Sequence, residues 1–204
     1  GGNVSMDGGI LNAYGGRIEL GGLAAPGNVN LLFEGDNLKL GFPENVTRAD
    51  VSLTNQAFVY VEADGGGDIA INARNLEILA GSKLFAGIVQ GLGTPETIAG
   101  DITLNATENI TIANAASRVY NDVNSDAIGN SGRININTGS LFVNDGAQIQ
   151  SFVYGEGNSG KIAINARDNI RLDNNAVIKV EGDRAGDSRI EGNKVNHCGA
   201  SKIE

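Results

Sequence analysis

The sequence contains no Trp, one Cys, one His and three Pro among its 204 residues. One cysteine cannot form a disulfide within the chain, and His197 with Cys198 is too small a ligand set for a zinc site. A Ser-His-Asp or Cys-His catalytic set would also have to use His197, which lies in a stretch without apolar alternation. We therefore predict no catalytic residues, no metal ligands and no enzyme activity.

Long apolar runs and an excess of positive charge are also missing. No apolar stretch approaches the roughly 18 residues that suggest a membrane-spanning helix. The first residues do not show the charged-then-apolar pattern of a signal peptide. Lys and Arg number 15 against 24 Asp and Glu, which gives a net charge of −9. The sequence therefore predicts neither nucleic-acid binding nor membrane insertion.

Glycine and asparagine, in contrast, are abundant, with 30 Gly and 25 Asn. Both residue types favour turns and left-handed backbone conformations, which argues against a helical protein. Hydrophobic residues make up 41% of the chain, and the aliphatic ones recur in short groups. We therefore expect a β-rich fold with many corners and a hydrophobic core.

A short motif of Gly, alternating aliphatic residues and Asn occurs four times. The copies are Gly67-Asp68-Ile69-Ala70-Ile71-Asn72, Gly100-Asp101-Ile102-Thr103-Leu104-Asn105, Gly132-Arg133-Ile134-Asn135-Ile136-Asn137 and Gly160-Lys161-Ile162-Ala163-Ile164-Asn165. They begin 33, 32 and 28 residues apart. A second aliphatic pair and a third aliphatic position follow each copy at nearly constant distances. The pairs are Leu76/Ile78, Ile110/Ile112, Leu141/Val143 and Ile170/Leu172, and the third positions are Leu84, Val119, Ile149 and Ile178.

Three short strands, two fixed corners and one variable loop describe one coil of a parallel β-helix, a solenoid whose coils stack about 4.8 Å apart. We therefore predict an all-β, right-handed parallel β-helix. Equivalent aliphatic residues should stack inside as two ladders: Ile69, Ile102, Ile134 and Ile162, then Ile71, Leu104, Ile136 and Ile164. The asparagines that follow should form a structural ladder of paired amides: Asn72, Asn105, Asn137 and Asn165. An up-and-down β-sandwich is the alternative, which the fixed spacing disfavours.

The pattern divides the chain into three regions. Residues 1–45 are less regular, and we predict irregular β coils there. Residues 46–183 should form the regular coils of about 28–33 residues. The alternation fades after that, although residues 186–190 can open another coil, and we predict an irregular tail over 184–204.

Further segments have a characteristic composition. They are Gly8-Gly9-Ile10-Leu11-Asn12-Ala13-Tyr14-Gly15-Gly16-Arg17-Ile18-Glu19-Leu20-Gly21-Gly22, Phe42-Pro43, Gly139-Ser140-Leu141 and Gly157-Asn158-Ser159-Gly160. With the repeated motif they resemble, over residues 1–183, the large exoproteins of the filamentous haemagglutinin family of cyanobacteria. The resemblance implies a secreted β-helix that an outer-membrane transporter exports by two-partner secretion, and that acts as an adhesin. The family's Asn-Pro-Asn-Gly segment is absent, so the resemblance implies that residues 1–45 are the end of a secretion-type domain.

The variable loops carry the only other candidate chemistry. If they leave the coil at equivalent corners, they bring four carboxylates together on one rim, near Tyr120 and Tyr154: Glu96, Asp122, Asp126 and Glu156. Such a rim could bind sugar or Ca²⁺, or act on a polysaccharide as a lyase or hydrolase. The simpler interpretation is a solvated acidic rim that keeps the stack soluble. The absence of Trp and the presence of only four Tyr argue against an extended sugar-stacking cleft.

The sequence therefore predicts a structural rod rather than an enzyme. The resemblance places the rod outside the cell, secreted or on the bacterial surface, with a glycan or surface receptor on a host or neighbouring cell as its partner. We predict no cofactor, with Ca²⁺ on the loop rim as the alternative. The competing hypothesis is a polysaccharide-binding or polysaccharide-degrading protein that uses the loop carboxylates.

Overall fold

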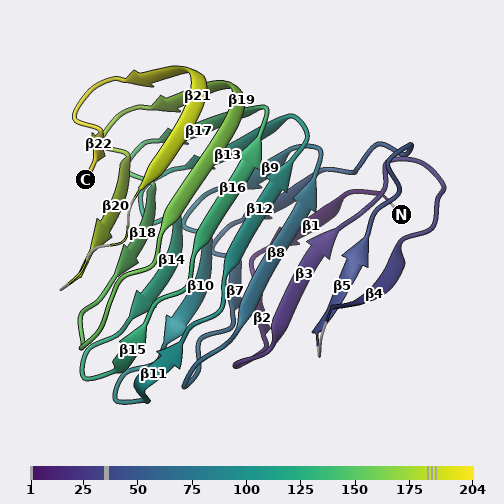
Figure 1. The fold of residues 1–204 in the computed structure, drawn as a ribbon. Helices are drawn as coiled ribbons and strands as arrows, with labels where there is room; N and C mark the ends of the chain where they lie inside the picture. The colour runs from purple at the N-terminus through teal and green to yellow at the C-terminus, as the bar shows by residue number, and fades with distance from the viewer. Residues whose placement is uncertain (1, 35–36, 183, 185, 187) are drawn as a thin grey trace.

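The computed structural model describes residues 2–34, 37–182, 184, 186 and 188–204. The chain winds into a stack of coils, and strands of successive coils lie side by side and run parallel (Figure 1). These described residues contain strands, turns and bends but no helix. The structure confirms the predicted all-β parallel β-helix.

Each coil has three sides, which we name faces A, B and C. Face A consists of β3 (Arg17–Gly21), β8 (Asp68–Ala73), β12 (Ile102–Ala106), β16 (Ile134–Thr138) and the first parts of β19 (Ile162–Leu172) and β21 (Arg189–His197). Face B consists of β1 (Val4–Asp7), β6 (Val51–Thr54), β9 (Leu76–Ile78), β13 (Asn109–Ala113), β17 (Ser140–Asn144) and the second parts of β19 and β21. Face C consists of β2 (Ile10–Asn12), β7 (Phe58–Tyr60), β10 (Lys83–Ile88), β14 (Arg118–Val123), β18 (Gln148–Phe152), β20 (Val177–Glu181) and β22 (Lys202–Ile203). Faces A and B form one 11-stranded sheet, and face C is a separate 7-stranded sheet.

The interior of the stack holds the two predicted aliphatic ladders. Ile102 is in register with Ile69 and with Ile134, and Ile134 is in register with Ile162. The second ladder, from Ile71 to Ile164, has the same register two residues further along each strand. All eight residues of the two ladders are buried in one continuous core with the aliphatic residues of faces B and C. No coil buries this surface alone, so stacking supplies most of the hydrophobic stabilisation.

The corner between faces B and C explains part of the high Gly and Asn content. In each coil the chain turns there through residues with positive φ. They are Gly8, Gly9, Asn55, Gln56, Ala80, Gly81, Asn114, Ala116, Asp145, Gly146, Asn174, Asn175 and Gly199. Glycine has no steric penalty in this conformation, and Asn and Asp tolerate it better than most residues. The fixed length of this corner keeps the strands on both sides in register.

Residues 1–45, predicted to form irregular coils, contain one regular coil and a hairpin. Strands β1, β2 and β3 pair in parallel with β6, β7 and β8 of the next coil. Between β3 and β6 the chain leaves the stack and forms an antiparallel pair, β4 (Asn30–Glu34) and β5 (Asn37–Gly41). Strands that are close in sequence pair locally at a low cost in loop-closure entropy. The hairpin contacts face A, where the Leu40 N–H donates to a carboxylate oxygen of Glu19 at 3.0 Å.

The variable connections between faces C and A are more ordered than the predicted loops. Strands β11 (Gly93–Ile98) and β15 (Ile128–Asn130) lie in two of these connections and pair in parallel. Beneath them is a second small core of four buried residues: Ile88, Ala99, Val123 and Ala127. The connections therefore widen the coil with apolar contacts of their own.

The prediction of an irregular tail over 184–204 is wrong for the residues described there. Strand β21 pairs with β19 from Ala163 to Leu172, and β22 pairs with β20. Ile190 and Ile203 pack against the main core. The tail lacks apolar alternation, but parallel pairing uses backbone hydrogen bonds, which most residue types can make. The coil pattern therefore continues to Ile203.

Candidate functional site

The outer surface of face A carries the predicted asparagine ladder. The Asn105 side chain donates to Asn72 Oδ1 at 3.2 Å, and the Asn137 side chain donates to Asn105 Oδ1 at 3.0 Å. Asn72 in turn donates to the Glu19 carboxylate at 2.8 Å. Asn165 is in register with Asn137 but makes no side-chain hydrogen bond to another described residue. These amides satisfy one another between coils, so the ladder is a structural device on the outside of the rod.

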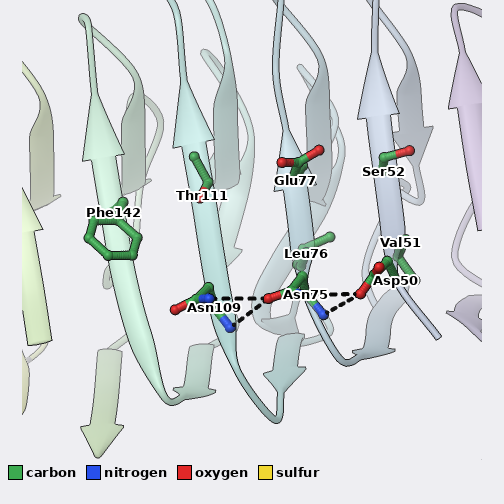
Figure 2. Close-up of a pocket in the computed structure, with 9 residues that line it drawn as sticks. All are labelled: Asp50, Val51, Ser52, Asn75, Leu76, Glu77, Asn109, Thr111 and Phe142. Atoms are coloured by element: carbon green, nitrogen blue, oxygen red, sulfur yellow. Dashed lines mark hydrogen bonds between the residues drawn. The ribbon is translucent and has the colours of Figure 1, made fainter. Parts of the chain in front are cut away.

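Face B carries a shallow depression of about 280 Å³ (Figure 2). Its side chains form one row across four strands, Ser52, Glu77, Thr111 and Phe142, which are neighbours by register. At one end of the depression Asn109 donates to Asn75 at 3.2 Å, and Asn75 donates to Asp50 at 3.0 Å.

Arg74 completes this end of face B. Its guanidinium makes two hydrogen bonds to the Asp50 carboxylate, at 2.9 and 2.6 Å. These bonds outweigh the effect of burial and, together with the hydrogen bonds from Asn75, lower the pKa of Asp50 to about 2. A carboxylate held so firmly in its charged form is a poor proton donor or acceptor near neutral pH. The depression is therefore a gap between short side chains rather than a reactive site.

Face C differs from the other two faces because aromatic side chains gather on or beside it. The chain has six Phe and four Tyr, and all the Tyr and three of the Phe lie here: Tyr14, Phe58, Tyr60, Phe85, Tyr120, Phe152 and Tyr154. Ring centroids are 5.6 Å apart for Tyr14 and Tyr60, 5.5 Å for Tyr60 and Phe85, and 5.4 Å for Phe85 and Tyr120. These distances are typical of edge-to-face and tilted aromatic pairs. We name the set Tyr14, Tyr60, Phe85 and Tyr120 the ring row.

Two buried carboxyl groups flank the ring row at the ends of the face C strands. Glu62 and Asp122 each retain only 6% of their accessible surface. Gly87 lies between them in register, so the coil between the two acids has no side chain at this position. Their backbones are therefore about 10 Å apart, the width of two strand spacings.

Each acid is fully held by hydrogen bonds. Asp122 accepts from the Phe152 N–H and from the Gln150 side chain, both at 2.8 Å. Glu62 accepts from the Tyr60 hydroxyl and, at 3.4 Å, from the Asn124 side chain. All of these partners are on or next to face C, so the network links the rings to the acids.

Burial changes the proton affinity of this network. It raises the pKa of Asp122 to about 7, and the hydrogen bonds from Phe152 and Gln150 only partly oppose it. Burial likewise raises the pKa of Glu62 and that of Tyr60, and the neighbouring Glu62 charge adds to the effect on Tyr60. Burial and the Asp122 charge raise the pKa of Tyr154. Shifts of this kind cluster at functional sites, although structural networks also produce them.

Lysine and arginine side chains lie against the same rings. The Lys83 amine is 5.5 Å from the centre of Phe58 and 5.8 Å from that of Phe85. The Arg118 guanidinium is 5.6 Å from the centre of Tyr120. Both cations are half-buried, and neither forms an ion pair with any described carboxylate. Strand pairing places Lys83 directly opposite Arg118.

The structure does not gather the four predicted rim carboxylates into one site. Glu96, Asp126 and Glu156 are exposed on the connections, and Asp126 accepts a hydrogen bond from Gln90 at 3.3 Å. The prediction for Asp122 is wrong, because this residue lies in strand β14 and is buried. Among the described residues, no three His, Cys, Asp or Glu side chains are close enough to hold a metal ion.

The sequence analysis missed Glu62 and the ring row. The sequence does contain a signal for them, directly after the third aliphatic position of a coil. Leu84 is followed by Phe85 and then, two residues later, by Gly87. Val119 is followed by Tyr120 and then, two residues later, by Asp122. Alignment on those positions would have brought the rings and one acid together.

No family model, curated protein or solved structure matches the chain. The resemblance to filamentous haemagglutinin exoproteins therefore remains a prediction. In the part of the chain that the structure describes, no helix has the length and apolar character to cross a membrane. The chemistry of face C must be interpreted from its own geometry.

Proposed function

We propose that the chain is a rigid segment of a secreted or cell-surface protein and acts as a structural rod in adhesion. The observation that carries this proposal is the register of the interior ladders, which is kept from coil to coil through Ile69, Ile102, Ile134 and Ile162. A stack whose neighbouring coils share one core lengthens without a change in cross-section. The exported location, the outer-membrane transporter and a glycan or surface receptor belong to the same proposal.

The rod accounts for the distribution of side chains better than an enzyme does. Catalysis by Glu62 and Asp122 would require carboxyl groups that reach a substrate. Both groups are nearly inaccessible and already accept hydrogen bonds from their own coils. The outer amides of face A, in contrast, serve only the stack.

Removal of one coil tests the rod. The deletion takes out residues 134–161, the repeat from Ile134 to Lys161, and joins Arg133 to Ile162, which is in register with Ile134. A rod should remain folded, become shorter by about 4.8 Å in small-angle scattering, and still support attachment when cells display the parent protein with this deletion. A control deletion of half a coil, residues 134–147, joins Arg133 to Gln148 and should unfold the segment, because it puts a strand of face C in a position of face A. Loss of attachment with an intact fold would contradict the rod, and so would labelling by antibodies to this segment only after cell lysis.

A further inference from the structure

The outer side of face C has an arrangement of charged side chains that a structural rod does not need. On the outside of face A, many side chains are matched between strands as amide pairs or as opposite charges, for example Arg17 with Asp68 at 3.3 Å, although the acids Asp68 and Asp101 also lie side by side in neighbouring coils. On the outside of face C, Lys83 stands directly opposite Arg118. Like charges that face each other across neighbouring strands are destabilising. The half-buried pair therefore carries an unfavourable energy that an anion between the two cations would relieve.

The surroundings favour an anion that is attached to a ring. The cations lie over the rings of Phe58, Phe85 and Tyr120, and the ring row continues from them across neighbouring coils. The face of a pyranose sugar is lined by C–H groups and packs against aromatic rings, while its substituents reach sideways. Coils about 4.8 Å apart repeat this combination along a line, as the units of an extended polymer do.

The acids of face C oppose such a ligand only weakly. Glu62 and Asp122 are buried and hydrogen-bonded to Tyr60, Asn124, Gln150 and the Phe152 backbone. Neither forms an ion pair with Lys83 or Arg118, and the charge of Asp122, which acts on Arg118 through space, is reduced near neutral pH because burial raises the pKa of Asp122 to about 7. Glu62 and Asp122 lie at the ends of their strands, so they do not cover the aromatic and cationic part of face C, which faces the solvent.

We propose that face C binds an extended acidic polysaccharide, with sugar rings against Tyr60, Phe85 and Tyr120 and sugar carboxylates at Lys83 and Arg118. Single-stranded nucleic acid also stacks on aromatic side chains. A uronic-acid polymer carries one carboxylate per sugar, as nucleic acid carries one phosphate per nucleotide, but it offers an apolar pyranose face directly beside each anion. Lys83 and Arg118 each lie over an aromatic ring, so the site likewise has a cation directly beside a ring. The proposal names a class of glycan for the partner in the proposed function and rests on it in that respect, whereas the structural rod does not depend on face C.

The test is binding of polygalacturonate and of alginate to the 204-residue chain, measured by affinity electrophoresis and calorimetry. We expect at least one of these uronates to bind. Carboxyl-reduced polygalacturonate, polyglutamate and poly(dT) should bind at least about tenfold more weakly, because each lacks the carboxylate or the pyranose ring. The double variant Lys83→Gln/Arg118→Gln should lose about tenfold in affinity, and Tyr120→Leu should also weaken binding.

Matched variants on other faces separate the site from general effects. Arg133→Gln removes an exposed cation beside face A, and Phe142→Leu removes the ring of face B; both should bind like the parent. The Lys83→Gln/Arg118→Gln variant should unfold at the same temperature as the parent or higher, since it relieves repulsion. The proposal is overturned if neither uronate binds, if the double variant binds as well as the parent, or if polyglutamate or poly(dT) binds equally well. Any of these results would leave the rod intact.

Discussion

Faces A and C have the same kind of interior and different exteriors. Inside, both present aliphatic residues in register, such as Ile136 on face A and Ile149 on face C, and both residues are fully buried. Outside, face A carries mainly amides and paired charges, whereas face C carries rings, buried acids and two cations, Lys83 and Arg118, that form no ion pair with a described carboxylate. The difference shows that the core of the stack constrains one side of each strand only. The other side is free to vary, and on face C it carries the rings and cations on which the proposed binding surface rests.

The largest expected effect comes from substitutions in the aliphatic interior that faces A and C share. Ile136→Asp places a charge without a partner inside the core, and Ile149→Asp does the same under face C. Each should cost about 5 kcal/mol or more of unfolding free energy, because an isolated buried charge is not solvated. Circular dichroism during urea unfolding measures the change. Asn135→Asp, one residue away on the outer side of face A, is the control and should remain folded; similar losses in all three variants would contradict the assigned interior.

The next effect depends on the acid that only face C has. Asp122 has a pKa of about 7 in the folded chain, above its ordinary value of 3.8. The folded state therefore holds this proton more tightly than the unfolded state between those pH values, so stability falls as the pH rises through the window. The full loss is about 4 kcal/mol, complete above pH 7. Glu62, whose pKa is also raised, contributes with the same sign.

Asp122→Asn isolates this contribution. The asparagine oxygen can still accept from the Phe152 N–H, and the Gln150 amide can turn to face the new amide. Urea unfolding at pH 4 and at pH 8 should show the parent losing about 4 kcal/mol more than the variant. The remaining carboxylates, including Asp50 with its lowered pKa, are common to both proteins and cancel. Parallel pH profiles for the two proteins would show that Asp122 has the same pKa in the folded and the unfolded chain.

Substitution of Gly87 tests how closely the coil between the two acids of face C packs against strand β14. Its φ is 137°, and a Cβ there would collide with the Asp122 backbone oxygen. Gly87→Ala should therefore cost about 3 kcal/mol, from backbone strain and displacement of β14. Gly91 has a φ of 74° and no neighbouring atom within 4 Å of a Cβ, so Gly91→Ala should cost about 1 kcal/mol for strain alone. Equal unfolding temperatures for the two variants would mean that the coils can separate at Gly87 without penalty.

The fold could be predicted from the sequence because its signal is local and repeated. Each motif such as Ile134-Asn135-Ile136 has the period of a half-buried strand, and equal spacing aligns the copies without further information. The candidate site has a weaker signal: an aromatic residue follows the third aliphatic position, but in the coil between Glu62 and Asp122 the acid is replaced by Gly87. Their burial depends on Tyr60, Asn124 and Gln150 from three different coils. The tail was missed for a related reason, since β21 pairs through its backbone and shows no apolar alternation.

The smallest expected effect concerns the exterior of face A. Asn105 donates to Asn72 and accepts from Asn137, so Asn105→Ala removes two hydrogen bonds from the ladder. The freed amides are near solvent and can bind water, which limits the cost to about 1 kcal/mol. Asn165→Ala is the matched control, because Asn165 makes no side-chain hydrogen bond to a described residue; its cost should stay within about 0.5 kcal/mol. Urea unfolding resolves the two values. If Asn165→Ala costs as much as Asn105→Ala, the side-chain ladder adds nothing, and the outside of face A contributes to stability through its backbone alone.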